Sequence, residues 1–411
     1  LVGTPSSDFS PVVFIPGITG SHLRKQGSNN DLWPGQVWGP DHNDLSNRPA
    51  DRDEDHPIYA PDVIRVAVLR FAPDAKIYES LLDKLDNGRT EYLVGGYPNR
   101  RTRAGCDLSQ AEDNPALFVF AYDWRLSNAG TAEQLAEYID CIHRFYPGVK
   151  VNIVAHSMGG LVARRYIIDQ GTDHSVRRLI TVGTPWLGAP KFLEVLETGW
   201  LDLKSLALIW PNEVRTLLEA FPGAHELLPS ATYFAYAQAS GEKNVFVEDG
   251  WDINGQGGAK QTYGYDELVA LVNSRYPKEP DSCGGDAVCR VGDNNRKFHS
   301  TAGQDSWTGE SDGIDYHYIV GIRRVRDTFA GYIATWVCNT SIGCSRVLKD
   351  TTTRGDGTVP LVSAQRAPLD GTPDGSGAVI HPIFTSRWID DKDDSNTEHL
   401  GMTQNITVQN L

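Results

Sequence analysis

Short apolar runs and helix-like segments alternate along the chain. The apolar runs are typical of strands buried in a parallel sheet, and they are residues 10–15, 117–121, 151–155, 178–182 and 316–321. Apolar side chains at helical spacing mark residues 77–85, 131–146 and 161–168. Thr131 and Gln134 predict a capping box, ahead of an apolar face formed by Leu135, Tyr138, Ile139 and Ile142. This alternation predicts an α/β fold with a mostly parallel sheet and helices on both faces.

The turn after residues 151–155 carries a serine flanked by small residues. Ala155-His156-Ser157-Met158-Gly159 fits the nucleophile-elbow pattern, with alanine in place of the first glycine. Such a turn lifts the serine hydroxyl off the sheet and aims the next N–H, that of Met158, at an oxyanion. The alternative is an ordinary turn, because this short pattern also arises by chance. The strand before it and the helix after it favour Ser157 as a nucleophile.

The first apolar run ends in a glycine-containing loop, Pro16-Gly17-Ile18-Thr19-Gly20. In folds with a nucleophile elbow, the loop after an early strand supplies the second oxyanion N–H. Ile18 is the candidate donor, and Thr19 is the next. A plain tight turn is the alternative reading.

The acid of a triad is expected after the serine in the chain. Asp356 lies in a Gly-Asp-Gly turn, which can present a carboxylate to a histidine. The glycines on both sides set Asp356 apart from the competing residues Asp312, Asp315 and Asp370.

The base is expected last, and only His381 and His399 follow Asp356. His381 lies within the apolar run 379–384, which predicts a packed or hydrogen-bonded histidine. His156 is a poor base for Ser157, because adjacent residues on the elbow point in different directions. His399 is therefore the predicted base. It would take the proton of Ser157 during attack on an acyl carbonyl, and water or another alcohol would release the acyl group.

Net charge and the length of the apolar runs limit the partners and the cellular location that we expect. Lys and Arg number 38 and Asp and Glu 53, which gives a formal net charge of −15 and disfavours nucleic acid and anionic membranes as electrostatic partners. No apolar run approaches the roughly 18 residues of a transmembrane helix. The chain starts at Leu1, and its only methionines are Met158 and Met402. We expect a processed, secreted protein whose signal peptide has been removed.

Six cysteines support an oxidising, extracellular setting. Proximity suggests the pairs Cys283–Cys289 and Cys338–Cys344, which leave Cys106–Cys141 by elimination. The spacing of zinc ligands is absent, and no cofactor is indicated. An acidic cluster reads as a solvated loop rather than a calcium site, and its members are Asp390, Asp391, Asp393 and Asp394. Glycosylation sequons begin at Asn339 and Asn405.

Several segments, taken together, resemble the lecithin:cholesterol acyltransferase family, which includes lysosomal phospholipase A2. They are residues 12–17, Tyr-Asp-Trp-Arg at 122–125, the elbow at 155–160, 183–188, Gly-Asp-Gly-Thr-Val-Pro at 355–360, and His399-Leu400. The resemblance implies an α/β-hydrolase core with a cap and a lid, and acyl-ester cleavage of lipids. It also implies Ile18 and Met158 as the oxyanion donors.

Two insertions are expected in a single α/β-hydrolase domain that spans residues 1–411. Residues 25–75 form a loop-rich, cap-like insertion, in which Trp33 and Trp38 pack under the loop or line an acyl site, with packing favoured. Residues 191–315 form a lid or cap, and an ordinary helical subdomain is the alternative. The middle of the chain matches little of the family, so substrate choice does not follow from the resemblance.

Three functions fit these observations. The first is a secreted serine esterase or lipase that acts on phospholipids or other long-chain esters, at a membrane or micelle interface. The second is an acyltransferase that moves the acyl group to an alcohol such as a sterol. The third is a lipid-binding protein that keeps the fold without catalysis, which an intact triad disfavours.

Overall fold

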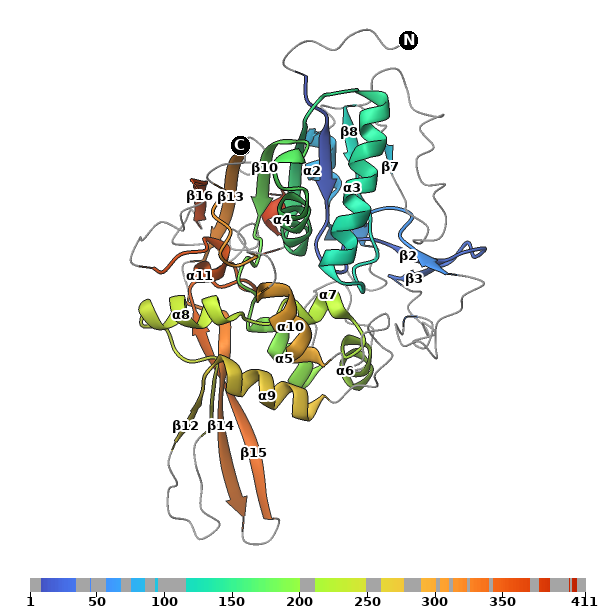
Figure 1. Ribbon diagram of the computed structural model, residues 1–411. Helices are drawn as coiled ribbons and strands as arrows, with labels where there is room; N and C mark the ends of the chain where they lie inside the picture. Colours follow the sequence, from blue (N-terminus) through green and yellow to red (C-terminus); the bar gives the residue numbers. More distant parts are fainter. Residues whose placement is uncertain are drawn as a thin grey trace, which may run out of the picture.

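The computed structural model describes residues 9–34, 45, 57–67, 75–85, 93–94, 116–199, 211–248, 260–276, 290–300, 304–309, 313–323, 326–339, 343–369, 377–384, 399 and 401–404. Its centre is a seven-stranded sheet (Figure 1). In spatial order the strands are β16 (Val379–Phe384), β13 (Asp315–Ile322), β10 (Val176–Val182), β9 (Val151–His156), β1 (Val12–Ile15), β8 (Leu117–Val119) and β7 (Leu93–Val94). All neighbouring strands in this sheet run parallel.

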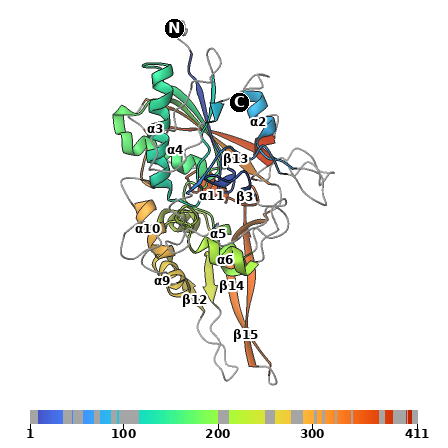
Figure 2. The same cartoon turned by 90° about the vertical axis from the view of Figure 1, so that its right-hand side faces the viewer.

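Helices cover both faces of this sheet, which explains the apolar character of its central strands. α3 (Asn128–Phe145) and α4 (Met158–Gln170) lie on one side, and α2 (Glu79–Leu85) lies on the other (Figures 1 and 2). β9 lies between β1 and β10, with Ile153 opposite Val13 on one side and Leu179 on the other. This is the α/β-hydrolase fold that the sequence predicts.

The start of α3 differs from the prediction. Its N-cap is Ser127, whose hydroxyl accepts a hydrogen bond from the N–H of Gly130 at 3.1 Å. Thr131 already lies inside the helix, and its own N–H donates to the carbonyl of Ser127 at 2.9 Å. The predicted capping box at Thr131 is therefore wrong. The predicted apolar face is confirmed by the burial of Leu135, Tyr138, Ile139 and Ile142.

Six helices between β10 and β13 in the chain lie together at one end of the central sheet (Figure 1). We call them the helical region, and they are α5 (Lys191–Thr198), α6 (Pro211–Leu218), α7 (Pro222–His225), α8 (Ala231–Ala239), α9 (Tyr265–Arg275) and α10 (Val291–Ser300). α7 is buried throughout. Its Phe221 neighbour packs edge-on against Trp124 at 5.6 Å between ring centroids.

A second sheet projects from the helical region, away from the central sheet (Figure 1). Its strands are, in order, β12 (Gln261–Tyr263), β11 (Phe246–Glu248), β14 (Thr328–Asn339) and β15 (Gly343–Thr353). The long antiparallel hairpin β14–β15 is not among the predicted elements. β14 pairs with β11, so the second sheet joins β11 and β12, which precede residue 315, to the hairpin, which follows it. The structure formed by the insertion therefore extends past its predicted boundary at residue 315.

The N-terminal insertion contains small antiparallel sheets. One consists of β3 (Asp31–Trp33), β2 (Leu23–Lys25) and β4 (Ile58–Tyr59), in that order, and the other of β5 (Val66–Ala67) and β6 (Ala75–Lys76). Trp33 is buried and packs edge-on against Trp124 at 5.4 Å, as the packing interpretation predicts. Trp38 lies outside the described residues.

Two of the predicted cysteine pairs have at least one member among the described residues. Cys141, in α3, is disulfide-bonded, and its predicted partner Cys106 lies outside the described residues. Cys338 lies directly opposite Cys344 in the β14–β15 register. Several other predicted features also fall outside the described residues, namely Asp312, Asp370, the acidic cluster 390–394, the sequon at 405 and the pair Cys283–Cys289. Within the described ranges, every helix is too short or too polar to cross a membrane.

Candidate active site

Ser157 occupies the sharp turn between β9 and α4. Its backbone has φ 52° and ψ −125°, a conformation that side-chain-bearing residues rarely adopt. Small neighbours make the turn possible, since a Cβ at Gly159 would lie 2.7 Å from the carbonyl oxygen of Ile15, and one at Gly160 would collide with Thr184. The N–H of Ser157 donates to the carbonyl of Val182 at 2.9 Å. These contacts fix a strained serine at the carboxyl end of the central strand.

Asp356 lies in the turn between β15 and α11 (Leu361–Ala364) and is buried. One carboxylate oxygen, Oδ1, accepts hydrogen bonds from the N–H groups of Thr358 at 2.9 Å and Val359 at 2.7 Å. Gly357 supplies the positive φ of 94° that the turn requires. The other oxygen, Oδ2, lies 2.8 Å from Nδ1 of His399. The carboxylate is therefore held by the backbone on one side and faces the imidazole on the other.

His399 follows β16 and precedes the short helix η6 (Gly401–Gln404). Its Nε2 lies 2.7 Å from Oγ of Ser157, and its own backbone N–H donates to the carbonyl of Asp356 at 3.0 Å. Because the carboxylate can only accept, Nδ1 carries the proton and Nε2 accepts from the Ser157 hydroxyl. The three side chains thus form the continuous hydrogen-bonded line Ser157–His399–Asp356.

The competing candidates are engaged elsewhere. Nε2 of His381 lies 2.9 Å from Nδ1 of His317 on the adjacent strand, which matches the hydrogen-bonded role predicted for His381. Burial and the neighbouring His317 lower the pKa of His381. Asp315 is half-exposed and pairs with Arg178 at 2.8 Å. In the part of the chain that the structure describes, no three or more His, Cys, Asp or Glu side chains gather as metal ligands.

The loop at 16–20 lies directly against the serine. A Cβ built on Gly17 would be 2.8 Å from Cβ of Ser157 and 3.3 Å from its Oγ. The N–H of Gly17 donates to the hydroxyl of Tyr78 at 3.0 Å, whereas among the described residues no acceptor takes the N–H of Ile18. Met158 is the first residue of α4, so its N–H has no acceptor within the helix. The N–H groups of Ile18 and Met158 are both available beside Ser157.

Four aromatic side chains hold this loop, and we call them the loop-binding aromatics: Trp33, Tyr78, Tyr122 and Trp124. Beside the Tyr78 contact, Tyr122 Oη donates to the carbonyl of Pro16 at 3.0 Å, Trp33 Nε1 to that of Thr19 at 2.9 Å, and Trp124 Nε1 to that of Ser21 at 3.3 Å. This role of the four aromatic side chains is not among the features predicted from the sequence. The Tyr-Asp-Trp-Arg motif was the available signal, but it does not name the backbone groups that its aromatics bind.

The same motif also supplies a buried ion pair. Arg125 donates from Nη2 to Oδ2 of Asp123 at 2.6 Å and from Nε to Oδ1 at 2.9 Å. Its Nη1 donates to the carbonyl of Leu45 at 2.9 Å. The two-point geometry fixes the turn that carries Trp124.

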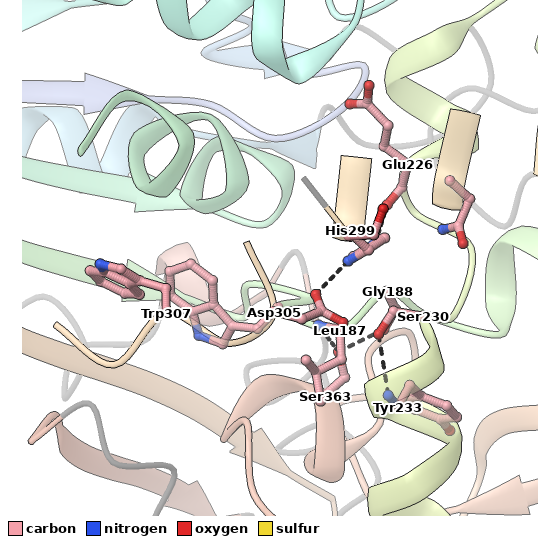
Figure 3. A network of polar contacts seen from close by, with 12 residues as sticks. Leu187, Gly188, Glu226, Ser230, Tyr233, His299, Asp305, Trp307 and Ser363 are labelled. Carbon is pink, nitrogen blue, oxygen red and sulfur yellow. Dashed lines mark hydrogen bonds and ion pairs between the residues drawn. The ribbon is translucent and has the colours of Figure 1, made fainter. Parts of the chain in front are cut away.

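A second polar network lies in the helical region (Figure 3). His299, on α10, points at Asp305, with 2.7 Å between Nδ1 and Oδ1, and its Nε2 lies 2.9 Å from the carbonyl oxygen of Glu226. The Glu226 side chain accepts from the N–H of Asn128 at 2.8 Å, at the start of α3. This network therefore ties α7 and α10 to the core.

Burial acts on the two carboxyl groups of this network with different outcomes. It raises the pKa of Glu226 to about 8, because the backbone and side-chain hydrogen bonds from Asn128 only partly oppose it. Burial also raises the pKa of Asp305, but His299 and Arg164 outweigh that effect and lower it to about 2. The raised pKa favours the protonated form of Glu226 near neutral pH, whereas the lowered pKa favours the carboxylate form of Asp305.

Comparisons with known proteins agree with this architecture. The profile of the family described as Lecithin:cholesterol acyltransferase matches residues 110–274, a segment that contains Ser157. The Arabidopsis thaliana protein Phospholipase A(1) LCAT3 is 24% identical over 332 residues, which cover 77% of this chain and 69% of the relative. The Homo sapiens protein Lysosomal phospholipase A and acyltransferase is 32% identical over 133 residues, which cover 31% of this chain and 30% of the relative.

A Saccharomyces cerevisiae relative, Uncharacterized protein YJR098C, is 40% identical over 81 residues, 19% of this chain and 12% of the relative. Apart from the LCAT3 match, the chain spans less than two thirds of the length of these relatives. Among solved structures, a chain of the Tle4–Tli4 complex shares the fold at 18% identity, with a TM-score of 0.56 and coverage of 98% of this chain and 97% of that one. These matches support a relation to the lecithin:cholesterol acyltransferase family, and the chain has the α/β-hydrolase fold.

Proposed function

We propose that this chain hydrolyses acyl esters of lipids through a covalent acyl-enzyme on Ser157. The observation that carries the proposal is the unbroken hydrogen-bonded line from Ser157 Oγ through both ring nitrogens of His399 to Asp356, at 2.7 and 2.8 Å. A serine is a weak nucleophile unless an adjacent base takes its proton, and the base needs a partner that fixes its tautomer. The three residues satisfy both needs.

In the proposed mechanism, His399 takes the proton of Ser157 as Oγ attacks the acyl carbonyl. Asp356 holds the proton on Nδ1 and stabilises the imidazolium that forms. The N–H groups of Ile18 and Met158 receive the oxyanion, and loss of one such donor typically lowers the rate by about 10²–10³. His399 then protonates the leaving alcohol, and it activates water for release of the fatty acid.

Lipid esters are proposed as substrates because the named relatives are phospholipases. The human relative is also named as an acyltransferase, which supports a second activity. The same acyl-enzyme would then pass its acyl group to an alcohol such as a sterol instead of water. The balance between the two depends on which acceptor reaches Ser157.

We further propose that the helical region caps the site as part of a single domain, with residues 25–75 as a smaller cap-like insertion. Support comes from the packing of α7 against the loop-binding aromatics, since a Cβ at Gly223 would lie 2.8 Å from the carbonyl oxygen of Trp124. α7 is thus a fixed part of the cap, so any lid movement would have to occur in parts of the cap other than α7.

Secretion is also a proposal. The disulfide at Cys141 and the cross-strand position of Cys338 and Cys344 favour an oxidising compartment. A link between Cys338 and Cys344 would close the end of the β14–β15 hairpin.

The test is product analysis by mass spectrometry after incubation with phosphatidylcholine vesicles that contain an alcohol acceptor. Free fatty acid as the main product supports the hydrolase, and a dominant new acyl ester supports the transferase. A serine-reactive fluorophosphonate provides the parallel measurement. Absence of both products and of the label would leave a non-catalytic lipid-binding protein.

A further inference from the structure

A buried chain of hydrogen bonds runs behind the proposed triad. The N–H of Gly17 lies 3.0 Å from the hydroxyl of Tyr78, and that hydroxyl lies 2.9 Å from Nδ1 of His156. Nε2 of His156 lies 3.1 Å from the carbonyl oxygen of His399. Tyr78 and His156 are both almost fully buried. The chain therefore connects the loop at 16–20 to the backbone of the proposed base.

The direction of each bond follows from its ends. A backbone N–H can only donate and a carbonyl can only accept. The Tyr78 hydroxyl thus accepts from Gly17 and donates its proton to Nδ1 of His156, and Nε2–H of His156 donates to His399. This assigns His156 the neutral tautomer with the proton on Nε2. Burial and the neighbouring His399 lower the pKa of His156 to about 3, which agrees with a neutral ring.

Each end of the chain constrains a group that the chemistry uses. At one end, the N–H of Gly17 is engaged by Tyr78, so the next N–H, that of Ile18, is left for the oxyanion. At the other end, His156 holds the carbonyl of His399, while the N–H of His399 donates to the carbonyl of Asp356 at 3.0 Å. The peptide groups on both sides of the His399 side chain are therefore fixed.

We propose that Tyr78 and His156 are positioning residues that set the placement of the base His399 relative to the oxyanion loop. The proposal rests on the proposed acyl transfer at Ser157, and neither residue needs to touch the substrate. A neutral His156 suits this role, because its ring centroid lies 5.0 Å from that of His399, and a charged ring there would oppose formation of the His399 imidazolium.

Packing alone does not account for the arrangement. Tyr78 packs edge-on against Phe14 at 5.0 Å and against His156 at 5.6 Å between ring centroids, and a phenylalanine would keep both contacts. Tyr78→Phe removes only the hydroxyl. It leaves the Gly17 N–H and the His156 Nδ1 without their partner, so the loop and the base lose their connection.

The matched control is Tyr138→Phe. Tyr138 is another buried tyrosine, and its hydroxyl donates to the carbonyl of Val119 at 3.2 Å. With p-nitrophenyl butyrate as substrate, we expect Tyr78→Phe to lower kcat about ten- to hundredfold with KM within about twofold, because the affected groups act in the transition state. Tyr138→Phe should keep the wild-type kcat. A folded Tyr78→Phe variant with the wild-type kcat overturns the proposal.

A second pair of variants tests the other end of the hydrogen-bond chain, where His156 binds the carbonyl of His399. His156→Gln keeps an N–H near the carbonyl of His399, whereas His156→Leu removes it. We expect the glutamine variant to retain at least about tenfold more kcat than the leucine variant, at similar melting temperatures. Equal losses in both folded variants contradict a role through the His399 carbonyl.

The tautomer gives a readout that is independent of turnover and of variant stability. In protein labelled with ¹⁵N-histidine, the ring nitrogens of His156 should report a proton on Nε2 from neutral pH down to about pH 5. A proton on Nδ1, or on both nitrogens, overturns the hydrogen-bond chain. Absence of turnover and of fluorophosphonate labelling in the wild type would instead refute the proposed function, and with it the positioning role.

Discussion

Nε2 of His399 lies 2.7 Å from Oγ of Ser157, although 242 positions separate the two residues in the chain. The short distance depends on the strained backbone of Ser157, whose φ is 52°. Such a conformation in a residue with a side chain costs on the order of 1–3 kcal/mol. The fold therefore gives up stability at this residue in order to present the hydroxyl to the base.

Substitutions at Ser157 should separate activity from strain. Alanine removes the hydroxyl and keeps the strained Cβ, whereas glycine removes both. We expect Ser157→Ala and Ser157→Gly to lose ester hydrolysis and fluorophosphonate labelling alike. Ser157→Gly should be the more stable of the two by about 1 kcal/mol in urea unfolding, after allowance for the greater flexibility of glycine in the unfolded chain. Turnover by Ser157→Ala would point to a different nucleophile.

Asp356→Asn should disable the base while leaving the turn in place. The N–H groups of Thr358 and Val359 both point at one carboxylate oxygen, so the amide oxygen will occupy that position. The amide NH₂ must then face Nδ1 of His399 and force the ring proton onto Nε2, where it cannot accept from Ser157. We expect kcat to fall by roughly 10³–10⁴ with little change in KM.

The control for this variant is Asp315→Asn, a half-exposed aspartate paired with Arg178. It should retain the wild-type kcat in the same assay. A wild-type kcat for Asp356→Asn would show that another carboxylate orients the base.

Gly17→Ala should act on the oxyanion loop. The added methyl would lie 2.8 Å from Cβ of Ser157 and 3.1 Å from Nδ1 of His156, so the loop has to move away from the elbow. We expect kcat with a soluble ester to fall at least about tenfold, because an N–H displaced from the oxyanion loses most of its effect. Gly148→Ala is the comparison, since its methyl meets no atom within 4 Å and its positive φ affects stability alone. Equal kcat values for the two variants would contradict the assigned position of the loop.

The parts of this molecule that the sequence predicts are those with a local signature. Apolar runs identify β1, β9 and β10 because these strands are covered on both faces. The order of serine, aspartate and histidine along the chain, with a glycine-flanked turn at Asp356, was enough to select the three residues that form the hydrogen-bonded line.

The missed features depend on partners that are distant in sequence. Tyr122 donates to the carbonyl of Pro16, 106 positions away, and Tyr78 binds the N–H of Gly17, 61 positions away. A backbone acceptor has no residue type, so no sequence pattern marks it. The hairpin β14–β15 was not predicted for a related reason. Its strands are defined by their register with each other, as in the pairing of Thr335 with Val347.

Glu226 should make the stability of the protein depend on pH. Burial raises its pKa from 4.5 to about 8 in the folded state. A carboxyl group whose pKa is higher in the folded than in the unfolded protein makes its full contribution to stability below its unfolded-state pKa. That contribution is lost as the pH rises towards its folded-state pKa. Compared with a variant whose side chain at this position does not titrate, the wild type should therefore lose on the order of a few kcal/mol of its free energy of unfolding between about pH 4.5 and about pH 8.

Glu226→Gln keeps an oxygen that can accept from the N–H of Asn128, and it cannot ionise. We expect the melting temperature of this variant, minus that of the wild type, to increase from about pH 4.5 and to level off above about pH 8. Glu137→Gln, at an exposed position on α3, should show a small difference of similar size at every pH. A flat profile for Glu226→Gln would mean that Glu226 is ionised in the folded protein at neutral pH. The carboxyl group that ties α7 to the start of α3 would then be an anion bound by the Asn128 N–H, and the helical region would be held to the core by charge rather than by a neutral hydrogen bond.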